Sequence, residues 1–434
     1  MTGELISTTR NSYDGLVVRE HALRVPLDYA APGGETIDLF ARELVTMRDE
    51  ARDLPFLAWF QGGPGNRADR PTAVSGWLKR ALQEYRVVLI DQRGTGGSSL
   101  INRTTLADRG GARQQAQYVA KFRADAIVED AEQIRRLIAG NEPWSILGQS
   151  YGGFIALNYL SFHAEGLREV FITAGLSTTS GNPDDVYTLT YQQTARRCDE
   201  FFAAYPGMNE RAWEIFEHLR SVEEHLLTGE RFTPERFQTL GIQLGAAAGF
   251  RQLYFQLESA FVQTRRGRRL SDFFLNEISA VVSFARNPLY ALLQEAIYTA
   301  GEPTKWSAHR VRDRFDEFSV GRARADGPFR FTGEMVYPWQ FEQDPALVPL
   351  REVAEELANM RGLPELYDPR ALASNPIPVS AAVYYDDMFV PRETSLHTAS
   401  LVRGIKLIIT NEYQHDGIRQ DGERLLAQLI EKVR

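Results

Sequence analysis

The stretch Trp144-Ser145-Ile146-Leu147-Gly148-Gln149-Ser150-Tyr151-Gly152-Gly153 decides which fold class the sequence predicts. It opens with an apolar run typical of a buried strand, and residues 154–160 continue it as an apolar helical pattern. The pattern Gly-x-Ser-x-Gly between them is typical of a sharp strand-to-helix turn, which needs nearly side-chain-free residues around the serine. The N-terminus of the following helix favours negative charge that develops there. We therefore predict a nucleophile at Ser150; the alternative is a structural turn that contains a serine.

Alternating strand and helix patterns extend from this stretch toward both ends of the chain. Apolar and β-branched runs predict strands, and apolar residues at helical spacing predict helices. The predicted strands cover residues 16–25, 36–47, 55–60, 86–90, 144–147, 170–174, 379–385 and 405–410, and the predicted helices cover residues 126–138, 154–160, 350–360 and the C-terminal segment. This order predicts an α/β core with a mostly parallel sheet.

Residues 180–345 show a different sequence pattern from the rest of the chain. They carry long, aromatic-rich helical patterns, such as residues 212–227 and 252–263, without β/α alternation. A segment of this length is no loop, so it must bury an apolar face of its own. We predict that residues 180–345 form a helical cap over a core built from residues 1–179 and 346–434.

A nucleophilic serine needs a histidine that takes its proton. On this type of core the chain order is serine, acid, histidine, and only His397 and His415 follow a strand that could carry the acid. His397 lies in a helical pattern, whereas His415 lies in a polar loop directly after the predicted strand 405–410. We assign the base to His415.

The acid should lie at the end of the preceding strand, where Asp386 and Asp387 stand side by side. Asp387 has the spacing Asp-x-x-x-Pro, with Pro391 opening the next helix, so we prefer it. Asp386 is the alternative, and a simple strand-end turn would explain either residue. The acid would fix the imidazole tautomer and stabilise the imidazolium.

Two backbone N–H groups are needed to stabilise the oxyanion of a tetrahedral intermediate. The N–H of Tyr151, the residue after the nucleophile, is one candidate. The other is Gly62 or Gly63 in the glycine-rich stretch that follows the predicted strand 55–60. Residues without side chains allow an amide to point into the site.

Composition and motifs exclude several other classes of protein. The chain has 434 residues, a net charge of −8 and one cysteine, so no intramolecular disulfide is expected, and a nucleic-acid partner has no support. We read the basic run at residues 265–269 as a solvated cap loop. The sequence contains no phosphate-binding Gly-x-x-x-x-Gly-Lys-[Ser/Thr] and no His-Glu-x-x-His, so we expect no metal and no cofactor. Without a signal-like N-terminus or an apolar run of ~18 residues, we expect a cytoplasmic location and no membrane partner.

Four motifs together resemble one known family. Gln61-Gly62-Gly63-Pro64-Gly65, Asp91-Gln92-Arg93-Gly94-Thr95-Gly96, Gly148-Gln149-Ser150-Tyr151-Gly152-Gly153 and Asp387-Met388-Phe389-Val390-Pro391 are similar to those of the proline iminopeptidases, serine peptidases with an α/β-hydrolase core and a helical cap. The chain length and the cap stretch Gly333-Glu334-Met335-Val336-Tyr337-Pro338-Trp339 resemble the larger bacterial subgroup. Gln61 stands where the smaller enzymes usually have His, and Gln414-His415 replaces the common Gly-His.

The resemblance implies release of N-terminal proline from short peptides through a Ser-His-Asp acyl-enzyme mechanism. It also implies that acidic cap residues bind the substrate amine, and Glu258, Glu295 and Glu334 are the candidates because each adjoins apolar cap residues. The aromatic residues Phe255, Tyr337 and Trp339 would line the proline pocket or form cap core. The alternatives are an esterase or amidase, an aminopeptidase with another preference, and a non-catalytic binding protein on the same fold. The oligomeric state cannot be predicted.

Overall fold

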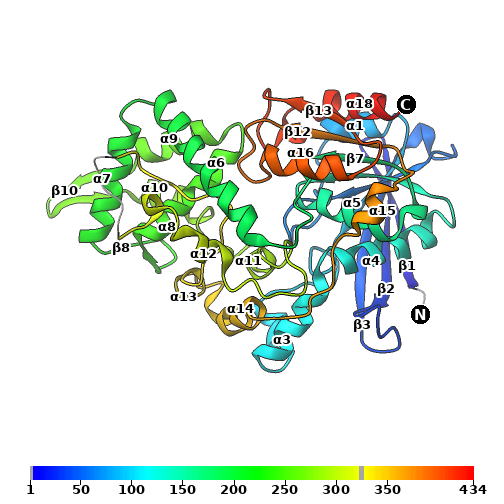
Figure 1. Ribbon diagram of the computed structural model, residues 1–434, viewed down its shortest axis with the longest axis horizontal. Coiled ribbons are helices and arrows are strands. Elements are labelled where there is room, and N and C mark those ends of the chain that lie inside the picture. Colours follow the sequence, from blue (N-terminus) through cyan, green and yellow to red (C-terminus); the bar gives the residue numbers. More distant parts are fainter. Residues whose placement is uncertain (1–2, 322–326) are drawn as a thin grey trace.

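The computed structural model describes residues 3–321 and 327–434 and has two parts (Figure 1). One part is built on a nine-stranded sheet and contains both chain ends, and the other is mainly helical. The strand order in the sheet is β1-β2-β3-β5-β4-β6-β7-β12-β13. The strands are β1 (Glu4–Tyr13), β2 (Leu16–Pro26), β3 (Thr36–Thr46), β4 (Phe56–Phe60), β5 (Arg86–Asp91), β6 (Trp144–Gln149), β7 (Leu167–Thr173), β12 (Val379–Tyr384) and β13 (Lys406–Thr410).

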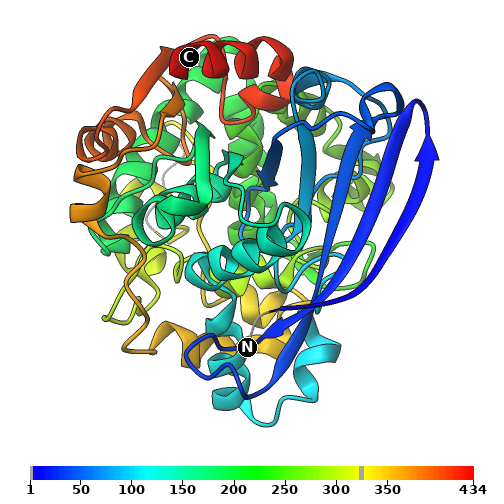
Figure 2. The ribbon, with the colours of Figure 1, turned by 90° about the vertical axis from the view of Figure 1, so that its right-hand side faces the viewer.

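The sheet is antiparallel at one edge and parallel elsewhere. β1, β2, β3 and β5 pair antiparallel in that order, and the long strands β1–β3 form a twisted ribbon at one side of the molecule (Figure 2). From β5 to β13 all neighbours are parallel. The sequence-based prediction of an α/β core with a mostly parallel sheet is confirmed.

Helices cover both faces of the sheet at its centre, where strands β4, β5, β6 and β7 are buried on both sides. In β4, Leu57 and Trp59 pack in one hydrophobic cluster with α1 (Gly76–Ala81) and α18 (Gly422–Val433). Ala58 and Phe60 point to the other face and pack in a second cluster with α4 (Ala124–Ile138) and α5 (Tyr151–Phe162). The other helices of this part are α2 (Arg103–Ala107), α3 (Ala112–Val119), α14 (Arg351–Ala358), α15 (Pro369–Ala373), α16 (Arg392–Leu401) and α17 (Gly417–Gln420).

The helical part follows β7 and has hydrophobic clusters of its own. Its helices are α6 (Pro183–Ala204), α7 (Met208–Ser221), α8 (Pro234–Gln238), the 3-10 helix η4 (Thr239–Gly245), α9 (Gly249–Glu258), α10 (Asp272–Ser279), α11 (Pro288–Leu293), α12 (Ser307–Arg312), the 3-10 helix η5 (Asp316–Phe318) and α13 (Gln340–Gln343). Residues 289–298 are not part of these clusters, because their apolar side chains pack with α4 and α5 in the cluster on that face of the sheet. Helix α11 therefore joins the two parts.

Several elements differ from the sequence-based prediction. Residues 212–227 and 252–263 were expected to be helical throughout, but α7 ends at Ser221 and α9 at Glu258. Short hairpin strands follow them: β8 (Glu224–His225) pairs with β9 (Arg231–Phe232), and β10 (Phe261–Thr264) pairs with β11 (Gly267–Leu270). The basic run 265–269 therefore lies in an exposed hairpin. Strand β1 was not predicted from the sequence, because all ten of its residues are exposed and no apolar alternation marks it.

The topology brings the predicted site residues to one edge of the sheet. The parallel strands β4, β6, β7, β12 and β13 are successive neighbours, so their carboxyl ends lie together. Gly62 follows β4, Ser150 follows β6, Asp387 follows β12 and His415 follows β13. Crevices at the carboxyl ends of parallel strands are where α/β proteins bind ligands.

Candidate active site

Ser150 occupies a strained turn between β6 and α5. Its φ of 54° and ψ of −120° lie outside the regions that residues with side chains favour. The neighbouring glycines explain how the turn fits: a Cβ at Gly148 would overlap the Gly152 carbonyl, and one at Gly152 would overlap the Phe60 carbonyl. Ser150 itself is 7% exposed. The turn presents the serine at the start of a helix, as the motif predicted.

Gly62 lies directly against this turn. A Cβ built at Gly62 would be 3.1 Å from both the Cβ of Ser150 and the carbonyl oxygen of Gln149, so a side chain there would crowd the serine turn. Gly63 follows with a φ of 149°, again a conformation that favours glycine. Gln92, which sequence reasoning did not single out, donates from its side-chain amide to the carbonyl of Gln61 at 2.9 Å. The Asp91–Gly96 motif therefore supports the loop that carries Gly62.

Asp387 and His415 form a hydrogen-bonded pair. The distance between Oδ2 of Asp387 and Nδ1 of His415 is 2.8 Å, with the carboxylate 1% and the imidazole 12% exposed. The other carboxylate oxygen accepts the backbone N–H groups of Phe389 (2.9 Å) and Val390 (3.1 Å). Burial by itself lowers the pKa of His415, but the charge and hydrogen bond of Asp387, aided by Glu334, raise it above 6.5. Because Nδ1 faces the acid, Nε2 is the nitrogen left for proton transfer.

Neither of the two alternative residues, Asp386 and His397, takes part in this hydrogen bond. Asp386 is half-buried beside Asp387, and the imidazole hydrogen bond goes to Asp387. His397 is exposed on α16.

The three glutamates proposed from the sequence to bind an amine occupy different environments. Glu258 is exposed at the end of α9 and accepts a hydrogen bond from Tyr254 at 3.2 Å. Glu295 is buried, but its carboxylate accepts the backbone N–H of Ala308 at 2.8 Å near the start of α12. The carboxylate of Glu258 is thus exposed to solvent, and that of Glu295 binds the backbone at the start of α12.

Glu334, the third of these glutamates, is close enough to His415 for its charge to raise the pKa of the imidazole. Burial raises its pKa, the positive charge of His415 partly offsets that rise, and Tyr290 donates a hydrogen bond of 2.5 Å to Oε1. Tyr290 and Gln294, whose side chain also hydrogen-bonds Glu334, were missed by sequence reasoning. A cavity of about 40 Å³ adjoins Tyr290, Glu334 and Phe284. No motif marks Tyr290, because its role depends on the packing of α11 against a stretch 44 residues away.

The three aromatic candidates for a proline pocket are placed differently. Phe255 is 55% exposed. Tyr337 is buried, and its hydroxyl lies 2.8 Å from that of Tyr191. Trp339 stacks on Tyr337 with ring centroids 5.6 Å apart. Tyr337 and Trp339 thus belong to a packed aromatic cluster of the helical part.

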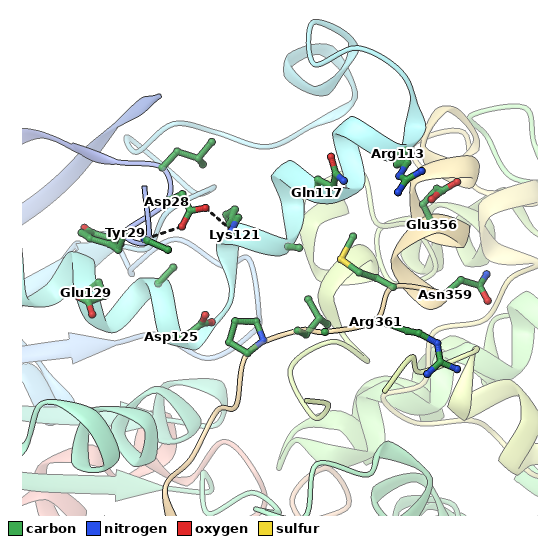
Figure 3. A pocket seen from close by; sticks show the side chains of 18 residues that line it. Asp28, Tyr29, Arg113, Gln117, Lys121, Asp125, Glu129, Glu356, Asn359 and Arg361 are labelled. Carbon is green, nitrogen blue, oxygen red and sulfur yellow. Dashed lines mark hydrogen bonds and ion pairs between the residues drawn. The ribbon is translucent and has the colours of Figure 1, made fainter. Parts of the chain in front are cut away.

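A cavity of about 940 Å³ lies away from these residues (Figure 3). It lies between α3, which contributes Arg113 and Gln117, the start of α4 with Asp125, and residues 356–364 around Asn359. None of the predicted site residues lines it. Within residues 3–321 and 327–434, no cluster of three or more His, Cys, Asp or Glu side chains could hold a metal ion. No helix of the described ranges is long and apolar enough to cross a membrane.

The strained serine turn, the acid–base pair and the parallel sheet with helices on both faces define an α/β hydrolase. A family model described as the alpha/beta hydrolase fold matches residues 59–213, which include the turn. A proline iminopeptidase of Aeromonas sobria is 44% identical over 418 residues, which cover 96% of each chain. The proline iminopeptidase aneH of Aspergillus aculeatus is 33% identical over 431 residues, 97% of this chain and 95% of that one. The chain belongs to the proline iminopeptidase family.

Proposed function

We propose that this protein is a serine exopeptidase that releases N-terminal proline from short peptides. The observation that carries the peptide specificity is the position of Glu334, a half-buried residue whose charge raises the pKa of His415. A charged imino group beside the scissile carbonyl needs a negative partner close to the base, and the apolar surroundings strengthen that attraction. The small cavity beside Tyr290 and Glu334 supports a ring pocket next to the amine site.

The proposed reaction proceeds through an acyl-enzyme. Nε2 of His415 takes the hydroxyl proton of Ser150, and Oγ attacks the carbonyl carbon of the first residue. The oxyanion accepts hydrogen bonds from the N–H of Tyr151 and from Gly62 or Gly63. His415 then gives the proton to the leaving amide nitrogen as its bond to carbon breaks. Water, deprotonated by His415, hydrolyses the ester and restores Ser150.

The cap would restrict the substrates to short peptides. We assign residues 180–345 to this cap and residues 1–179 and 346–434 to the catalytic core. Glu334 belongs to the assigned cap and His415 to the assigned core, and the charge of each shifts the pKa of the other. This proximity supports a site enclosed between the two parts. A folded protein substrate could not bring its N-terminus into such a site, whereas a short peptide could.

A panel of arylamides tests the proposal. Proline arylamide should be cleaved much faster than alanine or leucine arylamides and faster than a short-chain ester, and Ser150→Ala should lower kcat by at least about 10⁴-fold. A fluorophosphonate should label the native enzyme at Ser150 only. Cleavage of the ester alone would support an esterase instead, and full activity of Ser150→Ala would contradict the mechanism.

A further inference from the structure

The loop that carries His415 is held by a short stretch of the cap. The backbone N–H of His415 donates to the carbonyl of Gly245 at 3.1 Å. The next side chain, Asp416, accepts the backbone N–H of Ala247 through Oδ1, also at 3.1 Å. Residues 415–416 are thus joined by two hydrogen bonds to residues 245–247, about 170 positions earlier in the chain.

This cap stretch is itself fixed on both sides. The carbonyl of Leu244 accepts a hydrogen bond from Arg197 of α6 at 3.1 Å, and the Arg197 guanidinium lies 4.3 Å from the ring centroid of Phe250. Gly245 is buried so tightly that a Cβ there would overlap the ring of Phe389. That ring stands edge-on to the imidazole of His415, with centroids 4.9 Å apart. The cap stretch therefore contacts His415 in two ways. Gly245 accepts a hydrogen bond from the backbone of His415, and it packs against Phe389, whose ring contacts the imidazole.

We propose that Asp416 is a positioning residue for His415. Through Asp416, residues 244–247 of the cap keep the backbone of the general base in place. The proposal rests on the function assigned to His415 above. Asp387 fixes one ring nitrogen, but a single hydrogen bond does not fix the backbone from which the ring projects. Asp416 supplies that constraint, and its carboxylate is oriented in turn by Gln420, which donates to Oδ1 at 2.5 Å. Supporting groups of this kind matter because a displacement of about 1 Å can cost a factor of about 100 in rate.

Loss of the Asp416 contact should lower kcat and leave KM nearly unchanged. Asp416→Ala removes the acceptor, so we expect kcat on proline arylamide to fall roughly tenfold, with KM within about twofold of native. Asp416→Asn keeps an acceptor oxygen and should restore kcat to within about twofold. Glu412→Ala is the matched control on the same loop, because Glu412 pairs with Arg424 and is exposed.

A pH profile separates positioning from a general structural role. The groups whose charges act on His415 are Asp387, Glu334 and Arg419. If Asp416→Ala loosens the bond between His415 and Asp387, the pKa of His415 falls and the acidic limb of fluorophosphonate labelling moves to lower pH. Asp416→Asn should leave the limb in place. Equal shifts in both variants would mean that the charge of Asp416, rather than its hydrogen bond, is responsible, and would overturn the proposal.

A second variant removes the same contact from the cap side. Ala247→Pro eliminates the donor N–H at an exposed position, and the extended conformation of Ala246 (φ −108°, ψ 152°) suits a residue before proline. Ala247→Pro should lower kcat as much as Asp416→Ala, and the double variant should be no slower than either single variant. Additive losses, or a kcat equal to that of Glu412→Ala in both variants, would refute the proposal. An active Ser150→Ala would instead refute the proposed function.

Discussion

The turn around Ser150 and the surroundings of Glu334 reach their geometry in different ways. At the turn, a side chain at Gly148 would overlap the carbonyl of Gly152, and one at Gly152 would overlap the carbonyl of Phe60 in β4. Glu334 is held by the hydroxyl of Tyr290, which comes from a separate helix. The turn proposed to carry the nucleophile is therefore marked by glycines close to it in the sequence, whereas the carboxylate proposed to bind the substrate amine depends on packing between segments that no motif links. Chemistry and specificity can change independently in such an arrangement.

Removal of the acid tests the core side of this comparison and has the largest expected effect. Asp387→Asn keeps the size of the side chain but replaces the acceptor of the His415 Nδ1–H with a group that favours the wrong tautomer. We expect kcat on proline arylamide to fall by about 10⁴-fold, with KM little changed. Asp386→Asn is the matched control and should stay within about twofold of native. Equal losses in the two variants would contradict the assignment of the acid to Asp387.

Substitution of Glu334 should mainly change which substrates are cleaved. Glu334→Gln removes the negative charge proposed to bind the imino group, so we expect kcat/KM on proline arylamide to fall by about 100-fold. The labelling of Ser150 by a neutral fluorophosphonate, which has no amine, should fall far less. Glu258→Gln, an exposed cap glutamate, should leave both rates within about twofold. A parallel loss of both rates in Glu334→Gln would show that this residue supports folding rather than substrate binding.

These two regions also show how far the sequence leads. The mostly parallel sheet and the turn at Ser150 followed from local patterns, because strand and helix periodicity and glycine spacing are visible in the sequence itself. The pairing of Asp387 with His415 was proposed from their positions after two strands and from chain order, and the two side chains are hydrogen-bonded in the structure. The sequence could not distinguish Glu258, Glu295 and Glu334, because each adjoins apolar residues. Only the packed structure shows that Glu258 is exposed and that Glu295 binds the start of a helix. Strand β1 was missed for a different reason. It lies at the edge of the sheet and has no buried face, so no apolar pattern marks it.

Glu295 should matter for stability and not for catalysis. Glu295→Ala leaves the backbone N–H of Ala308 without its acceptor in a buried position, which costs about 1–3 kcal/mol. We expect the free energy of unfolding, measured by urea denaturation, to fall by that amount. The value of kcat/KM on proline arylamide should stay within about twofold. A large loss of activity at unchanged stability would return Glu295 to the list of amine-binding residues.

The smallest expected effect links the two regions through charge. His415 must be neutral to act as a base, and its pKa is raised above 6.5 by Asp387 and by Glu334, so labelling of Ser150 should be lost as the pH falls through that raised value. Glu334→Gln removes one of the charges that stabilise the imidazolium, so the midpoint should move to lower pH. Glu258→Gln should not move it. An unchanged midpoint in Glu334→Gln would mean that the cap carboxylate does not act on the base, and the amine would then have to be bound outside the reach of His415. A shifted midpoint would place the amine-binding charge and the general base within one enclosed site, as release of a single N-terminal residue requires.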